Sequence, residues 1–231
     1  MRERRPGVVP HAVGAAAAAL AGYRVFVRPR LLTWGATDDE AARRFPGDEL
    51  IPAAGSSSTM ATTLPAPPEE VWPWLVQMGC NRAGWYSWNR LDNGGRPSAD
   101  RIVPKWQQLE VGQRLDSVPS GRSWFTVALL VPGRTLVLRA QLELPSGRPF
   151  EARSGAPPRA FVDSLWGFHL APVPGGHTRL VVRSRSRSRP RPLTRPLDLL
   201  FGEPAHLIMQ TRQFRTLRAR VGAPQGTEPP P

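Results

Sequence analysis

The clearest pattern in the chain is an alternation of apolar and polar residues in four segments, 124–131, 135–142, 161–170 and 178–188. Pro132-Gly133-Arg134 separates the first two segments, and the Pro- and Gly-rich run 172–176 separates the last two. A period of two places alternate side chains on opposite faces of a strand, and Pro-Gly runs favour tight turns. The pattern therefore predicts two β-hairpins.

The last of these segments and the residue that follows it carry four arginines on one face: Arg183, Arg185, Arg187 and Arg189. Its other face carries Leu180, Val182, Ser184, Ser186 and Ser188. An antiparallel sheet with one solvated face produces such an alternation. We expect the arginines to face solvent, where they could also contact an anionic membrane surface. No aromatic residues are interleaved with them, so nucleic acid is disfavoured as a partner.

Helical patterns flank the predicted hairpins. Pro67-Pro68 followed by two glutamates predicts a helix from Glu69, with an apolar stripe up to Val76, after a weak strand at 59–64. A long helix is predicted from Pro204 to near Val221, since its apolar residues recur with helical spacing. Strand, helix, antiparallel strands and a long terminal helix indicate an α+β fold, with a curved sheet around the last helix.

Composition divides the chain into four zones: residues 1–30, a linker at 31–58, a domain at 59–221 and a Pro-rich tail at 222–231, expected to be disordered. The first zone holds an apolar run at 8–23, which is shorter than the roughly 20 residues of a spanning helix. Three interpretations stay open for it: a membrane anchor or interfacial helix, a segment that lies on the domain or is disordered, and a cleaved signal peptide.

The net charge of +13 raises the possibility of a polyanionic partner. Lys105 is the only lysine among 31 basic residues, which indicates a general arginine bias more than a dedicated site. The single cysteine, Cys80, excludes an internal disulfide and fits a cytoplasmic location, with membrane association through the first zone as an option. The four histidines lack metal-ligand spacing, so we expect no metal and no cofactor.

A long helix across a strongly curved sheet leaves space between the two layers, and aromatic residues beside small polar ones suit an apolar binding pocket. The candidate ligand-binding residues are Trp85, Tyr86, Trp88, Trp124 (or its neighbour Phe125), Trp166, Phe168, Ser184, Phe214 and Leu217. Alternatively, these side chains fill a core completely.

Enzymatic candidates are few. His206, Tyr86 and Asp100 are the groups that could handle protons in such a cavity, although each has a structural interpretation too. Asp100 could pair with Arg101 or Arg90, and the run Asp92-Asn93-Gly94-Gly95 is typical of a turn. The sequence therefore favours a binding protein over an enzyme.

Several stretches resemble a known superfamily: Trp34-Gly35-Ala36-Thr37, residues 68–79, residues 84–95, residues 97–102, residues 178–185 and residues 206–209. Over residues 33–221 the chain resembles an actinobacterial branch of the SRPBCC superfamily, the START-like proteins that include polyketide cyclases/dehydrases and lipid-transport proteins. Lys105-Trp106-Gln107 and Gln113 depart from that pattern, because relatives tend to carry acidic residues there.

The resemblance implies a helix-grip fold and a cavity for a hydrophobic ligand, but it implies no reaction. The leading hypothesis is binding or transport of a hydrophobic small molecule or lipid. Two alternatives stay open: a cyclase- or dehydratase-like enzyme that uses the same cavity, and a membrane-tethered interaction module with a filled core.

Overall fold

The sheet is the central element of the structure, a computed structural model that describes residues 14–15, 18, 21–151 and 157–222. Six strands pair antiparallel in the order β1-β6-β5-β4-β3-β2. They are β1 (Ser56–Leu64), β2 (Arg114–Asp116), β3 (Trp124–Val131), β4 (Thr135–Glu143), β5 (Phe161–Val173) and β6 (His177–Arg189). The two predicted hairpins are confirmed as β3–β4 and β5–β6.

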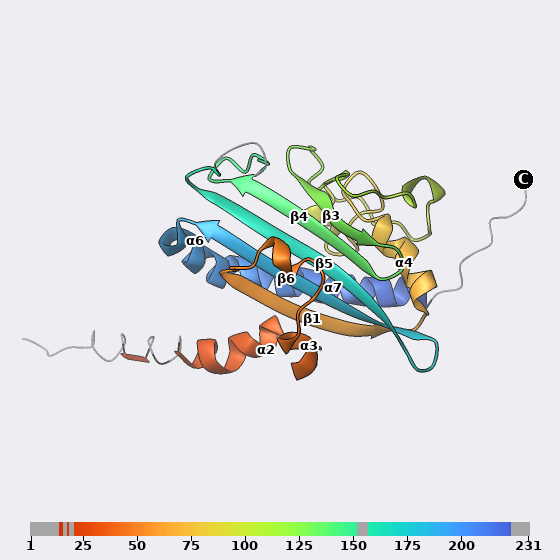
Figure 1. Ribbon diagram of the computed structural model, residues 1–231, viewed down its shortest axis with the longest axis horizontal. Helices are drawn as coiled ribbons and strands as arrows, with labels where there is room; N and C mark the ends of the chain where they lie inside the picture. Colours follow the sequence, from red (N-terminus) through yellow and green to blue (C-terminus); the bar gives the residue numbers. More distant parts are fainter. Residues whose placement is uncertain (1–13, 16–17, 19–20, 152–156, 223–231) are drawn as a thin grey trace, which may run out of the picture.

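Helix α7 (Glu203–Val221) and helix α4 (Pro68–Val76) pack on one face of this sheet. In Figure 1, α7 runs along the far side of the strands, and α4 lies near one end of it. Short helices complete the chain: α2 (Arg28–Leu32), α3 (Asp38–Ala42), α5 (Asn89–Asp92), α6 (Arg191–Leu197), π-helices at Tyr23–Val27 and Asp198–Gly202, and 3₁₀ turns at Asp48–Leu50 and Pro104–Trp106.

The main core lies between the sheet and these two helices. Phe214 and Leu217 of α7 are buried with Trp74 and Leu75 of α4 and with strand residues such as Phe168. The predicted helix-grip arrangement, an α+β fold with a curved antiparallel sheet packed on a long C-terminal helix, is therefore confirmed. Strand β2 was not predicted, because three residues are too few to show a period.

Residues 36–55 form a second layer on the opposite face, where the sequence predicted a linker. Phe45, Asp48 and Ile51 are buried, and β1 already begins at Ser56. Trp34 contributes a carbonyl that accepts from Ala61 N at 3.0 Å, next to the turn at Gly35. The linker prediction is wrong for this stretch, because its apolar residues cover the sheet. They are too widely spaced along the sequence to form a recognisable period.

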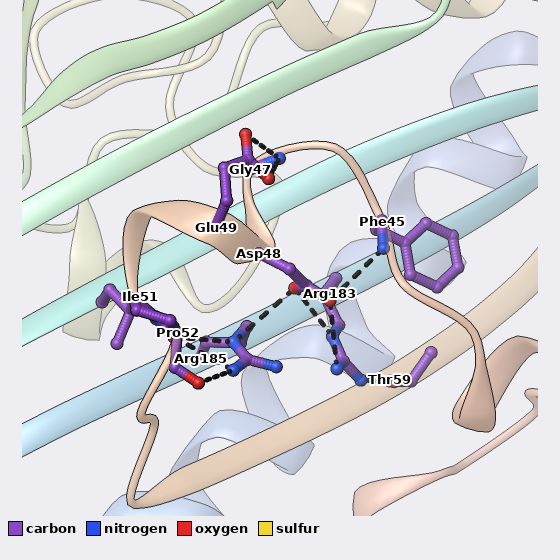
Figure 2. Close-up of polar contacts among 9 residues, drawn as sticks. All are labelled: Phe45, Gly47, Asp48, Glu49, Ile51, Pro52, Thr59, Arg183 and Arg185. Atoms are coloured by element: carbon purple, nitrogen blue, oxygen red, sulfur yellow. Dashed lines mark hydrogen bonds and ion pairs between the residues drawn. The ribbon is translucent and has the colours of Figure 1, made fainter.

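Arg183 and Arg185, the first two of the four arginines on this face of β6, lie beneath this layer. The expectation that they face solvent is therefore wrong. Figure 2 shows Asp48 between Arg183 and Arg185; Arg183 Nε lies 3.2 Å from Asp48 Oδ1, and both side chains are largely buried. The Arg185 guanidinium also donates to the carbonyls of Ile51 and Pro52. The arginines neutralise buried acids, which a period of two could not reveal.

Farther along the same face, Arg139 and Arg187 both donate to Asp163, a carboxylate with no exposed side-chain surface. Arg187 itself stays about two-fifths exposed, and Arg189 is exposed.

The predicted apolar run at 8–23 lies mostly outside the described residues. Among the helices that are described, none combines the length and apolarity needed to cross a bilayer.

Candidate functional site

A cavity of about 520 Å³ lies between the sheet and the first half of α7. Its volume is within the range of small-molecule sites, which is roughly 300–1,000 Å³. Its wall combines aromatic, aliphatic, hydroxyl and carboxyl side chains. The lining residues that the following argument uses are Ser56, Trp85, Ser87, Asp92, Phe125, Ser164, Trp166, Ser184, Arg185, Asp198, Glu203, His206, Met209, Gln210 and Gln213.

Three aromatic rings form one wall of the cavity. Trp85 lies in the loop after α4, Phe125 in β3 and Trp166 in β5. Their ring centroids are 5.4 Å apart for Trp85–Phe125, 5.5 Å for Trp85–Trp166 and 5.8 Å for Phe125–Trp166. At these spacings the rings pack edge to face or tilted, and together they present a large apolar surface.

A chain of hydrogen bonds fixes the side chains behind this wall. Trp166 Nε1 donates to Gln210 Oε1 at 3.1 Å, and Gln210 Nε2 donates to Gln213 Oε1 at 2.8 Å. Gln213 Nε2 then donates to the carbonyl of Trp85 at 2.8 Å. Both glutamines are buried, and the chain satisfies them without exposing either to water. The two indoles are therefore held in place from α7.

His206 and Ser184 form a polar pair on the wall. His206 Nε2 lies 3.3 Å from Ser184 Oγ, joining α7 to β6. Burial lowers the pKa of His206 to about 4, so the imidazole is neutral near pH 7. A neutral imidazole can both donate and accept a hydrogen bond, which suits orientation of a polar group on a ligand.

Three carboxylates also line the cavity among the described residues: Asp92, Asp198 and Glu203. Glu203 accepts two hydrogen bonds from Arg28, at 2.6 and 2.7 Å, and one from Ser56 at 3.3 Å. Burial is the main cause that raises the pKa of Asp198, with the charge of Glu203 adding to it. Burial also raises the pKa of Asp92 to about 6, although the Ser87 hydroxyl opposes the shift.

The structure brings together four of the residues predicted from the sequence: Trp85, Trp166, Ser184 and His206 all line the cavity. Phe125, the alternative to Trp124, lines it too. Three other candidates, Phe168, Phe214 and Leu217, lie in the adjoining core rather than on the wall.

The remaining candidates lie elsewhere. Tyr86 is fully buried, its hydroxyl accepts from Gln77 Nε2 at 2.6 Å, and burial raises its pKa. Trp88 is 45% exposed, with the Arg212 guanidinium over its ring. Trp124 lines a separate, smaller pocket, and Asp100 is exposed. Of the proposed proton-handling groups, the structure places His206 alone at the cavity.

Several cavity residues were not identified from the sequence. Gln210 and Gln213 carry no recognisable pattern, since polar residues on a terminal helix usually face solvent. Asp92 was interpreted as part of a turn. The pairing of Arg28 with Glu203 spans 175 positions, so no local signal announces it. The helical spacing of His206, Gln210 and Gln213, at intervals of four and three, is the one signal that places them on a common face.

No protein-family model matches the sequence, and no curated protein matches it either. Solved structures resemble it at low identity. Protein MLL2253 from Mesorhizobium loti is 17% identical with a TM-score of 0.43, over 72% of this chain and 96% of that one. A protein from Arthrobacter aurescens is 14% identical with a TM-score of 0.41, over 73% and 87%.

A third structure is DynU16, described as a protein of the dynemicin biosynthetic locus. It is 16% identical with a TM-score of 0.40, over 70% of this chain and 46% of that one. Because these TM-scores are below 0.5, the similarities carry no argument about function. The fold assignment depends on the sheet order and the packing of α7 described above.

Proposed function

We propose that this protein binds a hydrophobic small molecule or lipid in the cavity between the sheet and α7. The observation that carries this proposal is the 520 Å³ space itself, walled by Trp85, Phe125 and Trp166. A folded core normally leaves few voids larger than a water molecule. A space of this size beside three aromatic rings therefore favours a ligand site over the filled core of an interaction module.

The polar part of the wall supports the same function. Ser184 and His206 offer hydrogen bonds at one side of the space, while the Trp166–Gln210–Gln213 chain is already satisfied. A few orienting polar groups on a mostly apolar wall are typical of small-molecule sites. Preorganised aromatic side chains also reduce the entropy lost on binding.

The test is a titration of the full chain with Nile red, an uncharged dye whose fluorescence rises in apolar surroundings. Ser164→Phe places a ring inside the cavity, because Ser164 is on its wall. Ser146→Phe makes the same change in an exposed turn. We expect the wild type and Ser146→Phe to bind the dye with equal affinity, and Ser164→Phe to lose at least about tenfold in affinity. Equal binding by all three folded proteins would refute the proposal.

A further inference from the structure

Asp92 is a carboxylate of the cavity wall that forms no ion pair and accepts no hydrogen bond of normal length and angle among the described residues. Neither of its carboxylate oxygens has a partner among the described residues, and the residue is only 7% exposed. It also lines the cavity. The nearby Ser87 hydroxyl donates to the carbonyl of Met209 at 3.2 Å. Asp92 is therefore a buried acceptor that faces the binding space with unused capacity.

The local fold does not need the Asp92 side chain. Its expected role, to hold a turn, is carried out by its neighbours Asn89 and Asn93. Asn89 Oδ1 accepts from Ser98 N at 3.2 Å and from Ser98 Oγ at 2.9 Å. Asn93 Nδ2 donates to the carbonyl of Arg96 at 2.8 Å. A buried carboxylate without donors is costly to retain, so its presence on a cavity wall points to a ligand.

The charges around the cavity favour a positively charged ligand, although the protein as a whole has a net charge of +13. The Arg185 guanidinium points to the outer layer, where it donates to Ile51 and Pro52. The guanidinium of Arg28 is bound by Glu203. In the described part of the wall, the carboxylates of Asp92 and Asp198 are consequently left without a paired cation.

We infer that the ligand is an apolar molecule with a positively charged amine, and that Asp92 binds this amine at the cavity wall. This inference rests on the proposed function, since it assigns the ligand class of the same cavity. An ammonium group donates up to three hydrogen bonds, and a charge-assisted bond to a carboxylate is stronger than a neutral one. A ligand with a carboxylate head would instead meet like charge.

Three ten-carbon compounds with different heads, decylamine, 1-decanol and decanoate, test this inference. Each is titrated into the full chain by calorimetry at pH 8, below its micelle concentration. We expect the wild type to bind decylamine about tenfold to a hundredfold more tightly than decanoate. Asp92→Asn keeps the shape but removes the charge, and should reduce this ratio to about threefold or less. Asp100→Asn makes the same change at an exposed site and should keep the wild-type ratio.

Nile red binding separates failure of this inference from failure of the proposed function. If Nile red binds but decylamine has no advantage over decanoate, or if Asp92→Asn leaves the ratio unchanged, the assignment of an amine to Asp92 is overturned while the cavity function stands. If neither Nile red nor any of the three compounds binds the wild type, the proposed function fails, and the inference fails with it.

Discussion

The indole Nε1 of Trp166 donates a hydrogen bond to Oε1 of Gln210 at 3.1 Å, and this contact joins strand β5 to helix α7 at the cavity wall. Gln210 is 1% exposed and its amide continues to Gln213. The position of the Trp166 indole therefore depends on the two buried amides of Gln210 and Gln213. The cavity owes its shape to this polar chain as well as to apolar packing.

Gln210→Leu should destabilise the protein, because it removes the partner of the half-buried Trp166 Nε1 and leaves the buried Gln213 Oε1 without its donor. The expected loss is about 1–3 kcal/mol in the free energy of unfolding, measured by urea denaturation. Gln108 is exposed, so Gln108→Leu should change stability by less than about 0.5 kcal/mol. A double-mutant cycle with Trp166→Phe should give a coupling energy of about 1 kcal/mol. Strict additivity would contradict the proposed role of this hydrogen bond.

The outer layer should depend on Asp48. Its carboxylate contacts both Arg183 and Arg185 and accepts from Phe45 N at 3.3 Å. Asp48→Ala leaves two largely buried guanidinium groups without their anion, which should cost about 3–5 kcal/mol. Asp100→Ala, at an exposed position, serves as the control and should have little effect on the unfolding midpoint. A loss below about 1 kcal/mol in Asp48→Ala would show that the layer is held by other contacts.

Gly35 should be intolerant of any side chain, since it combines a φ of +71° with close contact to β1. An added Cβ would collide with the carbonyl oxygen of Ala61, which is backbone and cannot move aside. Gly133 has nearly the same φ, +70°, but nothing lies near its added Cβ. Gly133→Ala should therefore cost only the backbone strain of about 1 kcal/mol, and Gly35→Ala should cost at least about 1 kcal/mol more. Thermal denaturation of the two variants compares these losses, and equal melting temperatures would contradict the tight contact.

His206 should make stability depend on pH. Its pKa in the folded protein, about 4, lies below the ordinary value of about 6.5, so the unfolded chain binds a proton first as the pH falls. The stabilisation from the neutral imidazole is complete above about pH 6.5 and is lost towards pH 4, by roughly 3 kcal/mol in total. His206→Gln should lack this loss when unfolding is measured at each pH. The same slope in both proteins would contradict the burial of this imidazole.

Asp92 should change the pH dependence of stability in the opposite direction from His206. Its pKa of about 6 in the fold exceeds the ordinary value of about 3.8, so its destabilising effect grows as the pH rises from 4 to 6 and is complete above that. At pH 8, Asp92→Asn should therefore raise the free energy of unfolding of the ligand-free protein by about 1–3 kcal/mol. Urea denaturation at pH 8 and pH 4 measures this gain, which should shrink at the lower pH. A variant less stable than the wild type at pH 8 would show that the carboxylate has donors in the fold.

The sequence predicts the fold well where a period exists. The β3–β4 and β5–β6 hairpins and helix α7 each have a regular apolar pattern and clear Pro or Gly boundaries, and their predicted ends differ from the structure by a few residues. The layer formed by residues 36–55 has no such apolar pattern. It is held by ion pairs that join distant parts of the chain, such as Glu40 with Arg179 and Asp48 with Arg183.

The cavity is predicted only in part for a related reason. Trp85, Trp166 and Ser184 could be expected on its wall because large aromatic and small polar residues suit a pocket. Trp88 and Tyr86 are also aromatic, but their side chains lie elsewhere: Trp88 is at the surface and Tyr86 is in the core. The direction of a side chain in a loop depends on backbone turns that have no repeating pattern, such as the positive φ of 58° at Tyr86.

Native mass spectrometry of the full chain tests the central claim, that the cavity holds a hydrophobic ligand, most directly. The protein is incubated with a bacterial extract of lipids and apolar metabolites, and the wild type is compared with Ser164→Phe and Ser146→Phe. The account predicts a discrete added mass on the wild type and on Ser146→Phe, and no added mass on Ser164→Phe. Unliganded masses for all three folded proteins, or an added mass that Ser164→Phe retains in full, would contradict it.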